Sequence, residues 1–137
     1  MKRGKKPARE GEASSLRVLL LIAAILGGTG VALGAFGAHA LKGRLSDEAR
    51  SNYQTGVHYQ LIHALAIGVV VALTPRWISQ GVGAWVSGLF IAGVIGFSGS
   101  LYGLTTGVVK GRWGLVTPLG GLCFLAGWAL LAVRALA

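Results

Sequence analysis

Four long apolar runs, separated by short polar stretches, dominate the pattern of hydrophobic and polar positions along the chain. No Asp, Glu, Lys or Arg occurs between Val18 and Ala40. An apolar helix of this length crosses a hydrocarbon core of about 30 Å, because each residue adds about 1.5 Å. Three further runs are similar, so we predict membrane helices over about residues 18–40, 46–73, 84–108 and 115–133.

Polar residues between the runs indicate where the second helix begins and ends. Ser46 is followed by Asp47 and Glu48, which is typical of a capping hydroxyl with acids at the positive end of the helix dipole. Thr74-Pro75 ends the helix, because proline disfavours helical geometry in the residue before it. We therefore expect one long helix whose first turns lie at the membrane interface.

The first run also admits another interpretation, a cleaved signal peptide. A basic start, an apolar stretch and then Ala38-His39-Ala40 resemble such a segment with its small-x-small cleavage site. The run is longer than an ordinary signal core of about 7–15 residues, and the rest of the chain is equally apolar. We therefore favour a retained membrane helix.

Composition supports a membrane domain and excludes other classes of protein. Of 137 residues, 53% are hydrophobic and only 12% are charged, whereas soluble domains carry about 25% charged residues. The net charge is +9, and six of the thirteen Lys and Arg residues fall within the first 17 positions. We therefore expect no nucleic-acid-binding face. The fold class that results is all-α: a disordered basic N-terminal arm over residues 1–15, followed by an integral membrane four-helix bundle over residues 16–137.

The distribution of charge predicts an orientation. With four spans, both termini and the loop at Arg76 share one side, which carries eight basic residues against five on the other. The positive-inside rule then places both termini in the cytoplasm. The four tryptophans are expected near helix ends as interfacial anchors; they are Trp77, Trp85, Trp113 and Trp128.

Glycine is abundant, with 23 residues, and its spacing predicts helix packing. Membrane helices associate through close backbone contact and interhelical hydrogen bonds, and small residues at intervals of three or four permit that contact. We expect close packing within a compact bundle. The alternative is that one stripe, meaning a row of glycines along one helix face, packs against a second copy of the chain and forms a homo-oligomer. The packing candidates are Gly30, Gly34, Gly99, Gly103 and Gly107.

Polar side chains at membrane depth gather in one half of the bilayer. His63 is the most deeply placed ionisable residue, and we expect it to contact partners among His39, Tyr102 and Thr117. The group is either a hydrogen-bonded network that fixes the helices or a site for a small ligand, a lipid headgroup or a proton. Metal or haem ligation by the histidines is a third interpretation, which the absence of ligand spacing disfavours. The candidate polar cluster comprises His39, His58, Tyr59, His63, Ser98, Ser100, Tyr102 and Thr117.

We predict no metal, cofactor or catalytic residue. The three histidines have no metal-ligand spacing, and a single cysteine excludes a multi-cysteine cluster within the chain. No catalytic triad, phosphate loop or carboxylate pair is present. The sequence therefore favours a protein that is not an enzyme.

Five motifs, in order, resemble those of the YgdD-like family, small inner-membrane proteins grouped under a domain of unknown function. They are GAFGAHAL at 34–41, YQTGVHYQLIHALA at 53–66, FSGSLYGL at 97–104, TPLGG at 117–121 and Gly127-Trp128. The resemblance implies a four-helix protein of the bacterial plasma (inner) membrane. It implies no reaction, substrate or cofactor.

Two functional hypotheses follow. The first is a non-enzymatic accessory or interaction protein of the plasma membrane, whose partners are the lipid bilayer and either another membrane protein or a second copy. The alternative is a small-solute or proton-handling membrane protein that uses the polar cluster around His63. Neither involves nucleic acid.

Overall fold

The computed structural model describes residues 6–136, which form four helices long and apolar enough to cross a membrane. The third helix has three consecutive parts and the fourth begins with a 3-10 turn. This confirms the predicted all-α membrane fold, and no strand occurs among the described residues. The elements are α1 (Lys6–His39), α2 (Asp47–Leu73), α3 (Gln80–Gly93), the π-helical turn η1 (Val94–Ser98), α4 (Gly99–Thr105), the 3-10 turn η2 (Gly111–Leu115) and α5 (Val116–Ala135).

Helix α2 begins and ends where the polar residues predict. The Ser46 side chain accepts a hydrogen bond from the Ala49 backbone N–H at 3.2 Å. Asp47 and Glu48 occupy the first turn, where acids are favoured by the helix dipole. At the other end, the extended residue Thr74 is the C-cap. These local signals confirm both ends of the helix.

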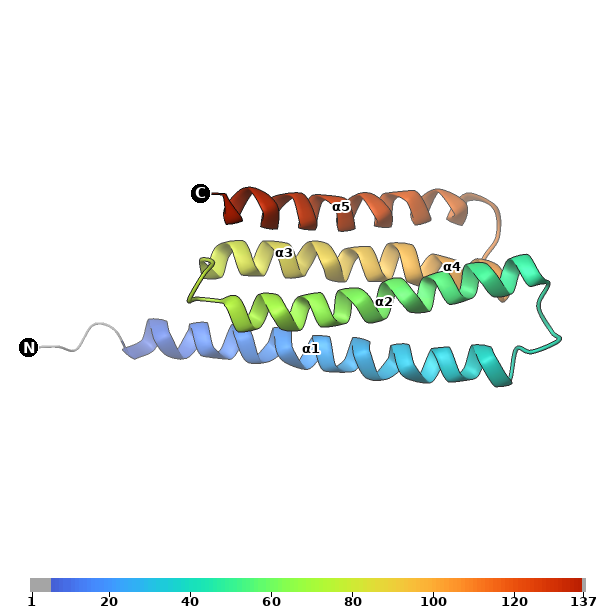
Figure 1. Ribbon diagram of the computed structural model, residues 1–137, viewed down its shortest axis with the longest axis horizontal. Helices are drawn as coiled ribbons and strands as arrows, with labels where there is room; N and C mark the ends of the chain where they lie inside the picture. Colours follow the sequence, from blue (N-terminus) through green and yellow to red (C-terminus); the bar gives the residue numbers. More distant parts are fainter. Residues whose placement is uncertain (1–5, 137) are drawn as a thin grey trace, which may run out of the picture.

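The four helices lie side by side in sequence order (Figure 1). Helix α1 packs on α2, α2 packs on the three parts of the third helix, and α5 packs on α3 and η1. In the most apolar windows of the two outer helices, only 11% and 17% of residues are buried within the protein, against 44% and 39% in the two inner helices. The arrangement is therefore more open than the compact packing that the glycine stripes suggest.

The buried core lies between the inner helices and α5. Ile67, Val86 and Phe90 are fully buried, and Phe124 of α5 closes the cluster. A smaller cluster around Tyr53 and its neighbours joins α1 to α2 nearer the α1–α2 loop. The core consequently holds α2, α3 and α5 together, whereas α1 is attached from one side.

The structure differs from the predicted arm over residues 6–15, which are helical and continuous with the first membrane span. These positions contain helix-favouring Ala, Glu, Lys and Arg, and they extend a helix that the apolar run already nucleates. The 34 residues of α1 span about 51 Å at 1.5 Å per residue, which exceeds a bilayer core of about 30 Å. Residues 1–5 of the predicted arm lie outside the described residues.

A π-helical turn, which the sequence analysis does not predict, marks the place where α5 crosses the third helix. A Cβ on Gly96 would lie 3.1 Å from the Gly120 Cα, and a Cβ on Gly120 would collide with the backbone of Gly96 and Phe97. The two backbones therefore touch, which only a glycine pair permits. Such π turns often occur at functional sites.

The predicted packing glycines divide into two groups. A Cβ on Gly30 would approach Leu61 to 2.8 Å, and one on Gly34 would approach Val57 to 3.2 Å, so both lie against α2. By contrast, Gly99 meets only a carbonyl of its own helix turn and Gly103 meets Val109 of the following turn.

Gly107 corrects the predicted stripe. It lies in the turn after α4 with φ of +77°, not on a helix face. The helix ends at Thr105, and the left-handed conformation that follows is one that glycine adopts without steric cost.

Candidate functional site

A glutamine at the middle of α2 connects three helices. The Gln60 side-chain N–H2 donates to the Leu26 carbonyl at 2.8 Å and to the Thr29 hydroxyl at 2.9 Å. Its carbonyl oxygen accepts from the Tyr102 hydroxyl at 2.8 Å. Gln60 is only 3% exposed. Its donors and acceptor are therefore occupied within the protein, and they join α1, α2 and α4.

Gln60 and Thr29 are absent from the predicted cluster, although the sequence holds a signal for each. Gln60 is an amide in the middle of an apolar run, and Thr29 is the one hydroxyl residue between positions 18 and 40. A polar side chain that lies alone at membrane depth needs a partner on another helix. Pairing Thr29, the one hydroxyl of the first run, with the Gln60 amide of the second run identifies this contact.

Tyr53 provides a second connection between α1 and α2. Its hydroxyl donates to the Leu33 carbonyl at 3.0 Å, and its ring lies 5.0 Å from the Tyr102 ring, centroid to centroid. The side chain is almost completely buried. Together with Gln60, it makes the junction of α1, α2 and α4 a satisfied structural network.

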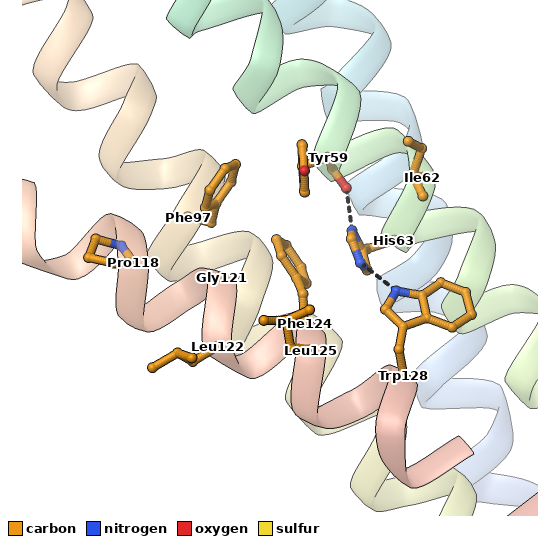
Figure 2. A pocket seen from close by; sticks show the side chains of 10 residues that line it. All are labelled: Tyr59, Ile62, His63, Phe97, Pro118, Gly121, Leu122, Phe124, Leu125 and Trp128. Carbon is orange, nitrogen blue, oxygen red and sulfur yellow. Dashed lines mark hydrogen bonds between the residues drawn. The ribbon is translucent and has the colours of Figure 1, made fainter. Parts of the chain in front are cut away.

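His63 forms a separate contact between α2 and α5. Its Nδ1 lies 2.8 Å from the Tyr59 carbonyl oxygen, and its Nε2 lies 3.1 Å from the Trp128 indole nitrogen (Figure 2). An indole N–H can only donate, so Nε2 must accept and Nδ1 must carry the hydrogen. The bonding thereby assigns a neutral imidazole with one tautomer. The ring stacks on Phe124 with 3.6 Å between centroids.

The partners expected for His63 were wrong. His39 is exposed at the end of α1, Tyr102 bonds to Gln60, and Thr117 lies 2.6 Å from the Ser100 hydroxyl. Position along the helix axis decides these pairings. Thr117 and Trp128 share nearly the same face of α5, because eleven residues make about three turns, but Trp128 is the one that lies level with His63. His58 is also exposed and lies on a different face of α2.

Trp128 corrects the expectation that all four tryptophans lie near helix ends. It lies within α5 and bonds to His63, because its N–H finds an acceptor on α2. The other three, Trp77, Trp85 and Trp113, lie in a turn or near the start of a helix and are exposed.

The two serines that follow Gly96 have different surroundings. Ser98 and Ser100 lie two and four residues after that glycine. The Ser100 hydroxyl bonds to the Phe97 carbonyl at 2.9 Å and to Thr117. The Ser98 hydroxyl is fully buried and has no partner within residues 6–136, as is also true of Ser87. Ser100 therefore joins the third helix to α5, whereas Ser98 stays alone in the π turn.

Between α2 and α5 lies an open cavity of about 540 Å³, here called the α2–α5 groove. Figure 2 shows its aromatic side chains facing one space, with the His63–Trp128 pair at one end. Leu122 and Leu125 at its edge are 58% and 66% exposed, so the groove opens toward the acyl chains of a bilayer. Its lining residues are Tyr59, Ile62, His63, Phe97, Pro118, Gly121, Leu122, Phe124, Leu125 and Trp128.

A second groove, of about 690 Å³, lies between α1 and α2. Glycines and aliphatic side chains line it, among them Gly27, Leu61 and Gly68. None of the candidate polar residues reaches it. Of the two grooves, only the α2–α5 groove combines apolar walls with hydrogen-bonding side chains.

The described residues contain no group of three or more His, Cys, Asp or Glu side chains placed to hold a metal ion. Cys123 is partly buried in α5 as a free thiol. The α2–α5 groove and the hydrogen bonds around Gln60 consist of neutral polar groups.

Four apolar helices, connected by polar side chains at membrane depth, define a small multi-pass integral membrane protein. The family described as "Protein of unknown function (DUF423)" matches residues 33–121, and the chain belongs to this family. That range contains every residue of the candidate polar cluster. The resemblance inferred from the five motifs is thereby confirmed.

The alignments with two bacterial relatives cover most of the chain. The UPF0382 inner membrane protein YgdD of Escherichia coli (strain K12) is 45% identical over 124 residues, which cover 88% of this chain and 90% of the relative. The UPF0382 membrane protein YwdK of Bacillus subtilis (strain 168) is 38% identical over 120 residues, covering 88% of this chain and 97% of the relative. No solved structure matches the chain.

Proposed function

We propose that the protein is a non-enzymatic accessory protein of the plasma membrane that binds a bilayer-dissolved molecule in the α2–α5 groove. The groove itself carries the proposal. Its volume of about 540 Å³ falls within the range of about 300–1,000 Å³ typical of ligand sites. Its walls are mainly aromatic and aliphatic, with a few polar groups, which is the usual composition of such sites.

The chemistry of His63 favours binding over catalysis. Both ring nitrogens are engaged, one by the Tyr59 carbonyl and the other by the Trp128 indole. A general base needs a free nitrogen within reach of the proton that it removes. The groove lining contains no carboxylate or cationic residue that could act in its place.

The hydrogen-bond network supports this role over the alternative of solute or proton handling. A conduction path requires polar groups that can exchange partners with water or solute in series. Here Gln60 is almost fully buried and its bonds are made to Thr29, Tyr102 and the α1 backbone. These groups stabilise the helix contacts instead of lining an aqueous route.

We also propose that both termini face the cytoplasm. The N-terminal end of α1, the loop between α2 and α3 and the C-terminus lie at one end of the molecule (Figure 1). Arg17, Arg76 and Arg134 belong to this end, and the sequence that precedes α1 adds further basic residues to the count. The excess of positive charge supports a cytoplasmic location.

Native mass spectrometry of the protein extracted in mild detergent tests the binding role. We expect the wild type to retain a small apolar molecule and Gly121→Leu to lose it, because the new side chain fills the groove. A Cβ at Gly121 would meet only Phe97, at 3.7 Å, so the backbone need not move. Gly68→Leu, in the α1–α2 groove, is the matched control and should retain the molecule. Equal retention by wild type and Gly121→Leu would contradict the proposal.

A further inference from the structure

The α2–α5 groove offers a single free hydrogen-bond donor. The Tyr59 hydroxyl makes no hydrogen bond within residues 6–136, and the side chain, which is 40% exposed, lies midway along α2 in the lining of the groove. The His63 and Trp128 nitrogens in the same lining are already paired. A hydroxyl at this depth has no water to bond with, and leaving it unpaired costs free energy. An acceptor on the occupant of the groove would remove that cost.

Aromatic rings surround this hydroxyl-bearing side chain. The Tyr59 ring lies 4.6 Å from the Phe97 ring and 5.7 Å from the Phe124 ring, centroid to centroid. Figure 2 shows the three side chains beside the open space of the groove. Aromatic side chains at such distances make offset or tilted contacts with one another, and an added planar ring can join them. The groove is consequently suited to a flat ring rather than to an acyl chain alone.

The charge of the groove restricts the occupant further. No Lys or Arg lines it, so a phosphate or carboxylate would enter without a counter-ion. Burying an unpaired charge in apolar surroundings is strongly unfavourable. Phospholipid headgroups and free fatty acids are therefore poor occupants, whereas a neutral ring with an oxygen acceptor suits the lining.

We infer that the α2–α5 groove takes a neutral planar ring with a carbonyl oxygen and an apolar tail, the chemistry of a membrane quinone. The carbonyl accepts the Tyr59 hydrogen bond, the ring packs among Phe97 and Phe124, and the tail leaves past Leu122 and Leu125 into the bilayer. The contact is one of binding and involves no electron transfer. This inference rests on the proposed binding role of the groove.

Quenching of Trp128 fluorescence by decylubiquinone tests the inference in lipid nanodiscs. Replacing Trp77, Trp85 and Trp113 by Phe leaves Trp128, in the groove wall, as the one indole. We expect saturable quenching that Tyr59→Phe weakens about fivefold to tenfold in affinity, since it removes one neutral hydrogen bond and little volume. Gly121→Leu should abolish the saturable part, and Gly68→Leu should leave it unchanged.

Competition by decylbenzene separates failure of this inference from failure of the proposed function. Decylbenzene has the ring and the tail but no oxygen. It should therefore bind the wild-type groove more weakly than decylubiquinone does, and it should bind the groove of Tyr59→Phe as well as it binds that of the wild type. If both probes compete for the groove with the same affinity and Tyr59→Phe changes neither, the carbonyl contact is refuted but the groove remains a binding site. If Gly121→Leu and a second blocking variant, Leu122→Phe at the exposed mouth, leave the quenching of Trp128 unchanged, both the carbonyl contact and the binding role of the groove are overturned.

Discussion

At the scale of single residues, two deep polar side chains of α2 connect it to different helices. Gln60 joins α2 to α1 and α4, whereas His63 joins α2 to α5. The two are three residues apart on α2, yet Gln60 reaches α1 at one edge of the molecule and His63 reaches α5 at the other. Neutral groups suffice for both contacts, because a donor and an acceptor are present in each.

Replacing Gln60 by leucine should destabilise the protein by about 2 kcal/mol, because three hydrogen bonds of about 0.6 kcal/mol each are lost. Denaturation by sodium dodecyl sulfate, followed by circular dichroism, measures the free energy of unfolding. Tyr102→Phe removes one of the three bonds and should cost less. In the double variant, the Tyr102→Phe change should add almost nothing. Fully additive effects would show that the Gln60–Tyr102 bond is absent.

His63 illustrates what sequence reasoning can and cannot reach at this scale. Its depth follows from its position in an apolar run, so its candidacy is apparent from the sequence. Its partner is not, because Trp128 lies 65 positions away and the tryptophan is equally compatible with an interfacial role. Choosing between the two requires the position of α5 along α2, which decides the residue of α5 that lies level with His63.

At the scale of elements, the contact between Gly96 and Gly120 fixes how α5 lies on the third helix. Backbone atoms meet there, and the π turn η1 occurs at the same level. The four spans follow from apolar length alone, and the ends of α2 follow from Ser46 and Thr74. The π turn has no such local signal. It adds one residue to a helical turn, and the run of residues that contains it remains apolar.

Gly120→Ala should lower the free energy of unfolding by several kcal/mol, at the upper end of single substitutions. The added Cβ collides with backbone atoms of Gly96 and Phe97, which cannot rotate away as a side chain could. Gly88→Ala in α3 is the control, since a Cβ there meets nothing within 4 Å. It should be neutral or stabilising by up to about 1 kcal/mol, given the better helix propensity of alanine. Detergent-denaturation curves compare the pair, and equal stabilities would refute the backbone contact.

At the scale of the whole molecule, the helices form an open row with two edges of different character. Helix α1 packs mainly on α2, whereas α5 is anchored by the buried Phe124 and the glycine contact. The topology predicted from charge is consistent with this arrangement, because the row has an even number of spans. Which end faces the cytoplasm stays a prediction.

Cysteine labelling tests the orientation. Ser46 and Ser79 cap the N-termini of α2 and α3 at opposite ends of the row, so Ser46→Cys and Ser79→Cys form a matched pair in a Cys123→Ala background. A membrane-impermeant maleimide added to intact cells should label Ser46→Cys and reach Ser79→Cys only after the membrane is opened. The reverse pattern would place both termini outside.

The row has a consequence for biogenesis. Each membrane helix packs on the one synthesised just before it, α2 on α1, the third helix on α2, and α5 on the third helix. No early helix must wait for a distant segment to supply its main contact, and chains assemble readily when native contacts are local in sequence. The helices can leave the insertion machinery in order and dock one by one. Helices α1 and α2 then form a hairpin before the ribosome has synthesised α5, which completes the α2–α5 groove.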